Sequence, residues 1–546
     1  MTKRYGAALL CALALLAGCG GSARKERVPL GEDGRYAETL TLSLGRYVTA
    51  DPRLPAGDTY TDNAYTRYLK DRLNITFVDE FEATGEDFDR QVALSIAAGE
   101  IPDIMTVQSE EIIKELINAD LIADLSELYA RYASPRIREI YDSFGGRCLG
   151  KATFGGRLMA LPGTRIDDRP FMFWIRQDWL DEAGITLDPD GDHCISLADL
   201  ETAARAFAAR GKGNVGLAFA SSLGDELAAL APAFGAFPNT WVRGADGVPR
   251  YGSLSDETRA CVAQLRAWYE SGVLDPQFGT RSWDEITALL INGKLGIVPG
   301  QWHVPDWRLP SVRRMDRKAV FMPYAAASPA GALAVTHSDA AERYVVVSKN
   351  CANPEAAILL LNILYDEMRS LDSAAYPDLG SYISLGVDNS TKPLWIECDP
   401  ASSLMDEYQE YREIAAGHIP LDSASTVYRR SIAESILAYQ KNPAAADAGE
   451  WSYYLSRMEG LRLMYDTAAA GRLAWTTPAF WGQTPTGRQR GGNLQTMQEE
   501  SFVKIITGAE PLAAFDTFVS RWKAEGGDTI TAEIAAVIAA ETEARN

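Results

Sequence analysis

The sequence predicts an α/β fold whose sheet is mainly parallel. Residues 40–44, 75–78 and 101–107 are short apolar runs of the length and residue types found in strands. Between the last two runs, residues 88–96 place apolar side chains at near-helical spacing. Strands that alternate with helices along a chain are typical of parallel sheets, because a parallel connection has to cross from one end of the sheet to the other.

The rest of the chain continues this pattern and then becomes helical. In the last third, apolar residues recur at helical spacing within 451–465 and 512–522, and such stripes must pack against a body. We therefore expect a helical C-terminal part. Further strands are predicted at 171–175, 215–220, 296–298, 319–322 and 344–347, and helices at 197–209, 256–270 and 354–368.

The ends of the first strands offer candidate ligand contacts by position. Ligands on open parallel sheets bind beyond the carboxyl ends of the strands. Arg46 and Tyr47 follow the first predicted strand, and Gln108 and Ser109 follow the third. These four residues are therefore candidates for ligand binding.

The N-terminus has the layout of a secretory signal. Lys3 and Arg4 precede an almost wholly apolar run, 7–17, which is too short to span a membrane. The run leads into Leu-Ala-Gly-Cys at 16–19, which resembles the lipobox of bacterial lipoproteins. We therefore predict a lipoprotein signal peptide at 1–18; an ordinary secreted protein with a chance cysteine is the alternative.

Cleavage at this position exposes Cys19, and the lipobox resemblance implies that its thiol is diacylated. Residues 19–38 are mostly small and polar, with little apolar surface to offset the entropy of ordering. They predict a flexible tether between the lipid anchor and the folded body. No later run reaches the roughly 18 uncharged apolar residues that a membrane span requires.

Composition excludes some classes of function. The chain of 546 residues carries a net charge of -21, which argues against nucleic-acid binding, because a nucleic-acid site needs a basic face. Five of the seven cysteines lie beyond the predicted anchor, widely spaced and without a Cys-x-x-Cys pair. This spacing predicts neither a disulfide framework nor a zinc cluster.

Motifs for catalysis or cofactors are weak. There is no Gly-x-Ser-x-Gly, His-Glu-x-x-His or Walker sequence, and the four histidines lie far apart in the chain. Gly211, Gly213 and Gly216 match the letters of a dinucleotide fingerprint, but a predicted helix precedes them where a strand is needed. The acidic run 188–192 is similar to a calcium loop, yet His193 stands where that loop needs glycine. We expect no cofactor, with calcium left as an alternative.

Six segments together resemble a known family: 99–104, 174–180, 268–278, 480–486, 499–508 and 515–528. In sequence, order and spacing they resemble the extracellular solute-binding lipoproteins of the LplA-like type, in the family 1 (oligosaccharide) group. The resemblance covers essentially all of the mature chain. Some relatives carry an acidic calcium loop before the strand that begins here at Val215, whereas this chain has Arg-Gly-Lys-Gly-Asn at 210–214, which argues against calcium there.

The resemblance implies a two-lobed, periplasmic-binding-protein-like fold of type II with a hinge between the lobes. We place lobe 1 at 39–164 plus 326–390, and lobe 2 at 165–325 plus 391–546. The implied function is that of the substrate-binding lipoprotein of an ABC importer, which captures an oligosaccharide by closure of two lobes without chemical change. The expected partners are ABC permease subunits and the cell membrane, reached through the lipid anchor. The protein is expected to be extracytoplasmic and monomeric.

Aromatic residues on loops are candidates for sugar contacts. A sugar ring has apolar C–H faces and a rim of hydroxyls, so its site combines flat aromatic rings with amides, carboxylates or arginine. If the ligand is acidic, Arg46, Arg165 or Arg176 would bind its carboxylates, and the sequence does not choose between acidic and neutral sugars. The predicted ligand-binding residues are Trp302, Trp481, Tyr324, Trp307, Trp174, Arg46 and Gln108.

Two alternatives of different function stay open at this point. A lipid-anchored carbohydrate-active enzyme, either a glycoside hydrolase or a lyase, would require a carboxylate pair that no local pattern marks. A binding protein for peptides or signalling ligands could use the same fold, because a fold does not determine its ligand.

Overall fold

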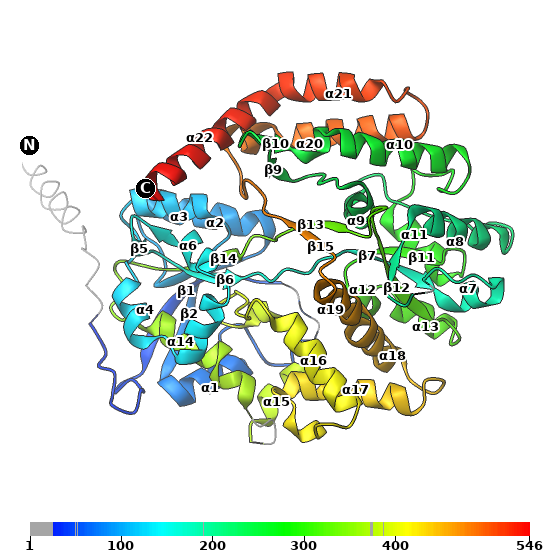
Figure 1. Ribbon diagram of the computed structural model, residues 1–546. Helices are drawn as coiled ribbons and strands as arrows, with labels where there is room; N and C mark the ends of the chain where they lie inside the picture. Colours follow the sequence, from blue (N-terminus) through cyan, green and yellow to red (C-terminus); the bar gives the residue numbers. More distant parts are fainter. Residues whose placement is uncertain are drawn as a thin grey trace, which may run out of the picture. The chain divides into compact units, whose positions relative to one another are not determined.

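The computed structural model describes residues 26–49, 51, 53–188, 190–371, 375–385 and 387–545. The predicted signal peptide 1–18 and the lipidation site Cys19 lie outside these residues. The chain divides into two compact units, which are coloured along the sequence in Figure 1. Unit 1 contains the residues up to Thr164 together with Ala341–Cys398, and unit 2 contains Arg165–Ala340 together with Asp399 to the C-terminus.

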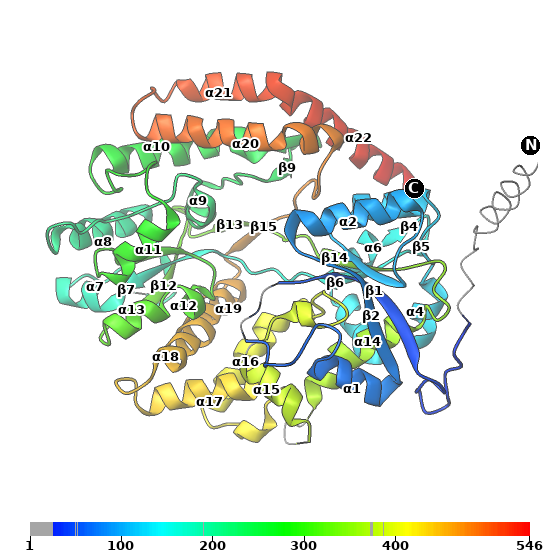
Figure 2. The same cartoon turned by 180° about the vertical axis from the view of Figure 1, so that it is seen from behind.

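Unit 1 is built on a five-stranded sheet in the order β2-β1-β3-β14-β6. Strand β1 is parallel to β2 and β3, whereas β14 is antiparallel to β3 and β6. Helices α2 and α3 lie on one side of the sheet and α1 and α14 on the other (Figures 1 and 2). The bounds are β1 Leu40–Tyr47, β2 Ile75–Ala83, β3 Ile104–Val107, β6 Leu161–Thr164, β14 Ala341–Val347, α1 Ala64–Leu73, α2 Gly85–Ala98, α3 Glu110–Asn118 and α14 Ala356–Tyr365. The smaller elements are α4 Ser126–Tyr132, α5 Pro135–Asp142, α6 Arg147–Lys151, β4 Thr153–Phe154, β5 Arg157–Leu158 and α15 Pro377–Leu385.

The predicted strands and the first helix of this unit are confirmed, with one boundary moved. Strand β3 begins at Ile104 and not at 101, because Asp103 is used for a side-chain link between strands. Its carboxylate accepts a hydrogen bond from the Ser43 backbone N–H at 3.0 Å, and its own N–H donates to the Ser43 hydroxyl at 3.0 Å. Both residues are buried, so this reciprocal pair fixes β1 against the start of β3.

The predicted flexible tether is wrong from Val28 onward. The side-chain amide of Asn353 accepts from the backbone N–H of Val28 at 3.0 Å and donates to its carbonyl at 2.8 Å. The ring of Tyr36 is 2% exposed, and its hydroxyl donates to Glu355 at 3.3 Å. A buried tyrosine ring provides apolar area that a composition average over 19–38 conceals. Residues 28–37 are therefore part of unit 1.

Unit 2 has a four-stranded sheet in the order β11-β7-β12-β8, and this sheet is mainly antiparallel. Strand β7 is antiparallel to both β11 and β12, and only β12 and β8 are parallel, so the predicted parallel arrangement is wrong here. The bounds are β7 Met172–Arg176, β8 Cys194–Ile195, β11 Ile297–Gly300, β12 Phe321–Ala326, α7 Gln177–Ala183, α8 Leu197–Ala209, α9 Gly224–Leu230, α10 Asp256–Glu270, α11 Trp283–Ile291, α12 Val304–Trp307 and α13 Pro310–Met315.

The strand predicted at 215–220 is also wrong. In the structure this segment has a single bridge, from Leu217 to Leu274. Its apolar residues are buried because they enter the core of unit 2 and not because they join a sheet. An apolar run of this length does not distinguish between these two environments.

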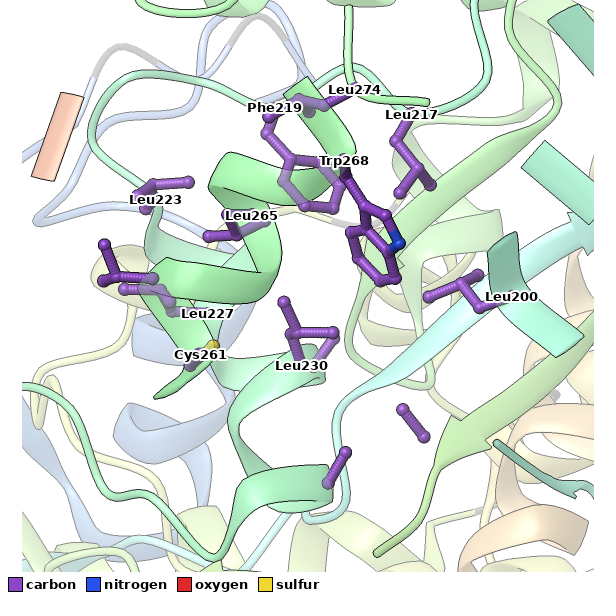
Figure 3. Close-up of a cluster of buried hydrophobic side chains, with 14 of the residues drawn as sticks. Leu200, Leu217, Phe219, Leu223, Leu227, Leu230, Cys261, Leu265, Trp268 and Leu274 are labelled. Atoms are coloured by element: carbon purple, nitrogen blue, oxygen red, sulfur yellow. The ribbon is translucent and has the colours of Figure 1, made fainter. Parts of the chain in front are cut away.

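The core of unit 2 gathers around helix α10, whose predicted bounds are confirmed. Figure 3 shows Trp268 of this helix among leucines from several segments, with Leu265 and Cys261 on the same helix face. Trp268 is 1% exposed, and its indole N–H donates to Glu201 at 2.9 Å. The core therefore buries a large ring without leaving its polar atom unpaired.

The helical C-terminal part is confirmed. Helix α20 packs between α10 and α21, and Figure 2 shows these helices as one layer of unit 2. The stripe predicted at 451–465 is buried through Trp451, Leu455 and Leu461, but a π-helical stretch, Leu455–Gly460, interrupts its α-helix. The bounds are α16 Ser403–Ala415, α17 Val427–Lys441, α18 Ala448–Tyr454, α19 Leu461–Ala469, α20 Pro485–Ile506, α21 Ala514–Trp522 and α22 Asp528–Arg545, with the strands β9 Trp241–Arg243, β10 Pro249–Tyr251, β13 Leu333–Thr336 and β15 Leu473–Thr476.

The boundaries of the two units agree with those of the predicted lobes at one crossing, 164/165, and differ at the other two. The sequence placed the second and third crossings at 325/326 and 390/391, whereas the units divide at 340/341 and 398/399. Residues 326–340 belong to unit 2 because β13 pairs with β15. Residues 391–398 belong to unit 1, where the Tyr365 hydroxyl donates to the carbonyls of Leu394 at 3.0 Å and Ile396 at 2.5 Å.

The segments that cross between the units are hydrogen-bonded to one another within each unit. In unit 1, Thr164 pairs with Ala341, and its N–H donates to the Glu397 carbonyl at 2.8 Å. In unit 2, the Arg165 N–H donates to the Ala340 carbonyl at 3.1 Å. None of the helices in the described ranges is long and apolar enough to cross a membrane.

Candidate ligand-binding site

The segment that follows β11 forms the first candidate site, in unit 2. Strand β11 ends at Gly300, whose φ of 153° is a backbone conformation that L residues avoid. A Cβ at Gly300 would lie 2.4 Å from Cγ2 of Val304. Glycine therefore allows the chain to leave the sheet and turn at once into the segment 301–308.

Two tryptophans of this region form an exposed pair. Trp307, at the end of α12, is 51% exposed, and Trp283, at the start of α11, is 38% exposed. Their ring centroids are 5.9 Å apart with an interplanar angle of 20°. Two adjacent exposed indole rings form a larger apolar patch than a single exposed residue, and such patches often bind ligands. The pair offers a flat apolar surface beside polar side chains.

His303 holds Trp307 in this position. The indole N–H of Trp307 donates to Nδ1 of His303 at 3.1 Å, which requires that nitrogen to be unprotonated. Burial lowers the pKa of His303 below its ordinary value, and Asp306 and Asp168 oppose the shift. The imidazole is therefore neutral at neutral pH and leaves Nε2 as a possible donor.

Arg308 lies beneath the tryptophan pair. The carbon of its guanidinium is 3.5 Å from the centroid of the Trp283 ring, which is a cation–π contact. The side chain is buried, and its Nε has no hydrogen-bond partner among the described residues. Burial lowers the pKa of Arg308 to about 10, while Glu226 and Asp225 act in the opposite direction, so the group stays charged at neutral pH.

Carboxylates surround this segment. Asp168 accepts hydrogen bonds from Gln301 and from Arg169, the latter at 2.6 Å. Asp225, at the start of α9, is half-buried, and burial raises its pKa against the opposing effect of Arg308. We use the name unit 2 aromatic site for Trp283, Trp307, His303, Arg308, Asp168 and Asp225.

Three of the predicted aromatic residues lie in the core of unit 2. Trp174 is fully buried, and its N–H donates to the Gln301 carbonyl at 3.1 Å, so it supports the segment after β11 from below. Tyr324 is 6% exposed and donates to Gln177 at 2.7 Å. Trp302 is 9% exposed, and the Arg457 guanidinium lies 4.8 Å from its ring. In this structure these rings pack rather than offer a surface.

Trp481 is half-buried and follows Phe480, whose backbone bridges to Trp241. Phe480 and Trp241 line a cavity of about 170 Å³ with Tyr251 and Trp522. Of the seven predicted contacts, the structure therefore brings Trp302 and Trp307 into one segment, with Trp174 beneath it. Tyr324 belongs to β12, and its hydroxyl bonds to Gln177.

The second candidate site lies in unit 1, at the end of β1. The rings of Tyr47 and Trp395 stack with centroids 3.8 Å apart and an interplanar angle of 8°. The guanidinium of Arg343 lies 4.5 Å from the Trp395 ring. Both aromatic residues are half-buried. We use the name unit 1 aromatic site for Tyr47, Trp395 and Arg343.

Arg46 supports this site from the interior. It is 4% exposed and pairs with Asp79 of β2 at 2.8 Å. One guanidinium nitrogen, Nη2, and one carboxylate oxygen, Asp79 Oδ1, have no hydrogen-bond partner among the described residues. Gln108 is exposed and donates to Asp89 of α2 at 3.1 Å.

Sequence reasoning missed Trp283, Trp395 and Arg343. Trp283 is the first residue of a helix capped by Ser282, and a large ring at that position has no core face to fill. Trp395 and Arg343 belong to the segment 341–398, which joins β1 only because the chain returns to unit 1. Their distance in sequence from Tyr47 left no local signal.

The described ranges contain no group of three or more His, Cys, Asp or Glu side chains that could hold a metal ion. In the acidic run similar to a calcium loop, the Asp188 carboxylate accepts from the backbone N–H groups of residues 191, 192 and 193. Asp192 pairs with Arg472 at 2.6 Å. These carboxylates are thus occupied by the protein itself.

Two α/β units linked by three crossings, each with an aromatic surface beside polar groups, define a two-lobed binding protein. The sequence model of one family, described as bacterial extracellular solute-binding protein, matches residues 51–368. The chain belongs to this family, and its place is therefore extracytoplasmic. Family members are binding proteins.

Solved structures share the fold at low sequence identity. A solute-binding protein of Bifidobacterium longum infantis, described as binding HMO, is 14% identical, with 92% of this chain and 98% of that chain covered and a TM-score of 0.56. The protein FusA of S. pneumoniae in complex with kestose is 15% identical, with 93% and 100% covered and a TM-score of 0.56. The alginate-binding protein AlgQ2 is 14% identical, with 94% and 100% covered and a TM-score of 0.56.

One curated relative matches over a short stretch. An uncharacterized protein of Niallia circulans is 45% identical over 38 residues, which is 7% of this chain and 15% of that protein. The chain thus spans a small part of that relative, and the match carries no functional argument.

Proposed function

We propose that this protein is the substrate-binding component of an ABC importer and captures an oligosaccharide without changing it chemically. The observation that carries the proposal is the exposed Trp283–Trp307 pair, stacked beside the polar groups of the unit 2 aromatic site. Membership of the solute-binding family supports a role in capture. The neighbours described as binding HMO, kestose and alginate support a saccharide as the ligand class.

The chemistry of the two sites suits a sugar ring. The C–H face of a pyranose or furanose can lie on the indole rings of Trp283 and Trp307, where it removes apolar area from water. Hydroxyl groups at the ring edge can donate to the Asp225 carboxylate and accept from His303 Nε2. In unit 1, Tyr47 and Trp395 provide a second stacked surface.

We also propose that Cys19 carries a lipid anchor and that ABC permease subunits are the partners. The basis for the anchor is the Leu-Ala-Gly-Cys run at 16–19. The test is expression of the wild type and Cys19→Ala in a bacterium with lipoprotein processing. We expect wild type in the membrane fraction and the variant in the soluble extracytoplasmic fraction. Equal membrane retention of both forms would contradict the anchor.

A saccharide screen tests the proposed function. The mature chain from residue 20 is incubated with neutral and acidic oligosaccharides, and its melting temperature is followed, because any ligand that prefers the folded state raises it. A shift with at least one saccharide, followed by recovery of the ligand with unchanged mass, is the expected result. Shortened products would instead favour a lipid-anchored glycoside hydrolase or lyase. A shift with peptides and with none of the sugars would favour the peptide-binding alternative.

Substitution in the aromatic pair localises the binding. We expect Trp307→Ala to weaken saccharide binding about tenfold or more, because it removes one of the two stacked rings. Trp475→Ala is the matched control, since Trp475 is 38% exposed in unit 2 and stacks on His337 instead. Isothermal titration calorimetry of both variants gives the comparison. An equal loss of saccharide affinity in Trp307→Ala and Trp475→Ala would contradict the placement of the ligand on the Trp283–Trp307 pair.

A further inference from the structure

The charged side chains around the two aromatic sites indicate which ligand charge the sites prefer. We infer that the ligand is an uncharged oligosaccharide and that uronate or otherwise anionic sugars are rejected. The inference rests on the proposed function, because it concerns the same two sites. It is argued from the ion pairs around each site.

In unit 1, each guanidinium beside the aromatic stack already has a carboxylate partner. Arg46 pairs with Asp79 at 2.8 Å, and Arg343 pairs with Glu342 at 2.6 Å. The Arg46 pair is buried, with side chains 3% and 5% exposed, so its positive charge is already balanced by Asp79 where water is excluded. Within the described residues, both guanidinium groups beside the unit 1 aromatic stack therefore have a carboxylate partner.

In unit 2, two of the three nearby arginines are also paired. Arg169 pairs with Asp168 at 2.6 Å. Arg457, beneath Trp302, pairs with Asp306 and lies 3.6 Å from Glu407. An anionic ligand would gain little from either guanidinium, because its charge is already balanced by a neighbouring carboxylate.

Arg308 is the remaining cation, and its charge is balanced in another way. It forms no ion pair among the described residues; burial lowers its pKa, and the charges of Glu226 and Asp225 oppose that shift. The ring of Trp283 covers one face of the guanidinium at 3.5 Å. One positive charge thus faces two acidic side chains, and a ligand carboxylate would add a third.

Asp225 itself favours a hydroxyl donor. It is half-buried, and within the described residues it makes no hydrogen bond or ion pair. A partly buried carboxylate without a donor is unfavourable, so this group gains from a ligand that supplies O–H. Neutral sugars supply hydroxyls without bringing a negative charge. An anionic sugar would bring its carboxylate beside Asp225, which has no ion-pair partner among the described residues.

The test is a calorimetric titration with pairs of ligands that differ in charge. Galacto-oligosaccharides are compared with oligogalacturonates of equal length, and manno-oligosaccharides with mannuronate oligomers, alongside neutral fructo- and xylo-oligosaccharides. We expect measurable binding of at least one neutral sugar, and binding of every acidic sugar at least about 100-fold weaker. Tighter binding of an acidic sugar would overturn the inference while leaving the proposed function in place. Absence of binding by any saccharide, neutral or acidic, would overturn both.

Substitution of Asp225 tests whether its carboxylate is the group that disfavours anionic sugars. Asp225→Asn keeps the shape and removes one negative charge, so we expect the difference between a neutral sugar and its uronate counterpart to shrink about tenfold. The control is Asp422→Asn in the same unit, where the carboxylate side chain is 90% exposed. An unchanged difference in Asp225→Asn, with a melting temperature close to wild type, would remove Asp225 from the explanation. The same change in both variants would show an effect of net charge alone.

Discussion

The two aromatic sites differ in how much of their surface is free. In the unit 2 aromatic site, Trp283 and Trp307 are exposed, and Nε of the neighbouring Arg308 has no hydrogen-bond partner in the part of the chain that the structure describes. In the unit 1 aromatic site, Tyr47 and Trp395 are half-buried against each other and rest on the buried Arg46–Asp79 pair. The comparison indicates that the rings of unit 2 are accessible at the surface, whereas the rings of unit 1 also stabilise their own unit.

The largest expected effect comes from breaking the buried ion pair of unit 1. Asp79→Ala leaves Arg46 charged and buried, and should lower the free energy of unfolding by about 3–5 kcal/mol. Urea denaturation measures this loss. The double variant Arg46→Met with Asp79→Ala should recover a large part of it, because no unpaired charge remains. A double variant as unstable as the single one would show that the pair matters through packing alone.

A smaller effect separates the two aromatic sites directly. Trp395→Ala should lower the free energy of unfolding by about 2 kcal/mol, since a half-buried ring leaves a smaller cavity than a core tryptophan. Trp307→Ala should change it by less than about 0.5 kcal/mol, because the ring is exposed. Thermal unfolding of both variants tests the comparison. Equal losses of stability would remove the distinction between a structural and a free surface.

Strain at the Gly300 turn should lower the free energy of unfolding by about 1–2 kcal/mol when glycine is replaced. Gly300→Ala places a Cβ against Val304 at a positive φ, so it should reduce both stability and saccharide binding. Gly492→Ala is the control: Gly492 is exposed within α20, a Cβ there meets nothing within 4 Å, and alanine should stabilise the helix by about 0.5–1 kcal/mol. In urea denaturation we expect Gly300→Ala to lower the free energy of unfolding and Gly492→Ala to raise it.

The smallest effect is the pH dependence of His303. Its folded pKa is lowered below the unfolded value of about 6.5, so the unfolded chain binds the proton more tightly. The stability from the neutral imidazole is therefore fully present above pH 6.5 and is lost as the pH falls through the folded pKa. We expect His303→Gln to reduce the loss of unfolding free energy between pH 7.5 and pH 5, because glutamine does not titrate in this range. An identical pH profile would contradict a titrating His303.

Local sequence patterns predicted most of unit 1 but less of unit 2. The strands at 40–44, 75–78 and 101–107 become neighbours in one sheet, because short parallel connections keep consecutive elements together. In unit 2 the sheet is mainly antiparallel, and β11 and β12, which lie on either side of β7, come from segments distant from it in sequence. Apolar runs predict that a strand exists, but its direction depends on connections that the runs do not encode.

The residues of the candidate sites could be predicted only where a local sequence pattern marked them. Tyr47 was predicted because it ends a strand, and Trp307 because it lies on a loop rich in glycine and proline. Trp395 could not be predicted, because its contact with Tyr47 depends on the return of the chain across 340/341. Trp174 was predicted as a ligand contact but is fully buried, since β7 is the central partner of both β11 and β12.

If Cys19 carries the proposed lipid, the hydrogen bonds between Val28 and Asn353 limit how far unit 1 can extend from it. Val28 lies nine positions after Cys19, and a fully extended chain gains at most about 3.3–3.6 Å per residue. Asn353 would then stay within roughly 30 Å of the lipid head groups. A linker of this length would favour delivery of cargo to the proposed permease close by over wide sampling of the surrounding medium.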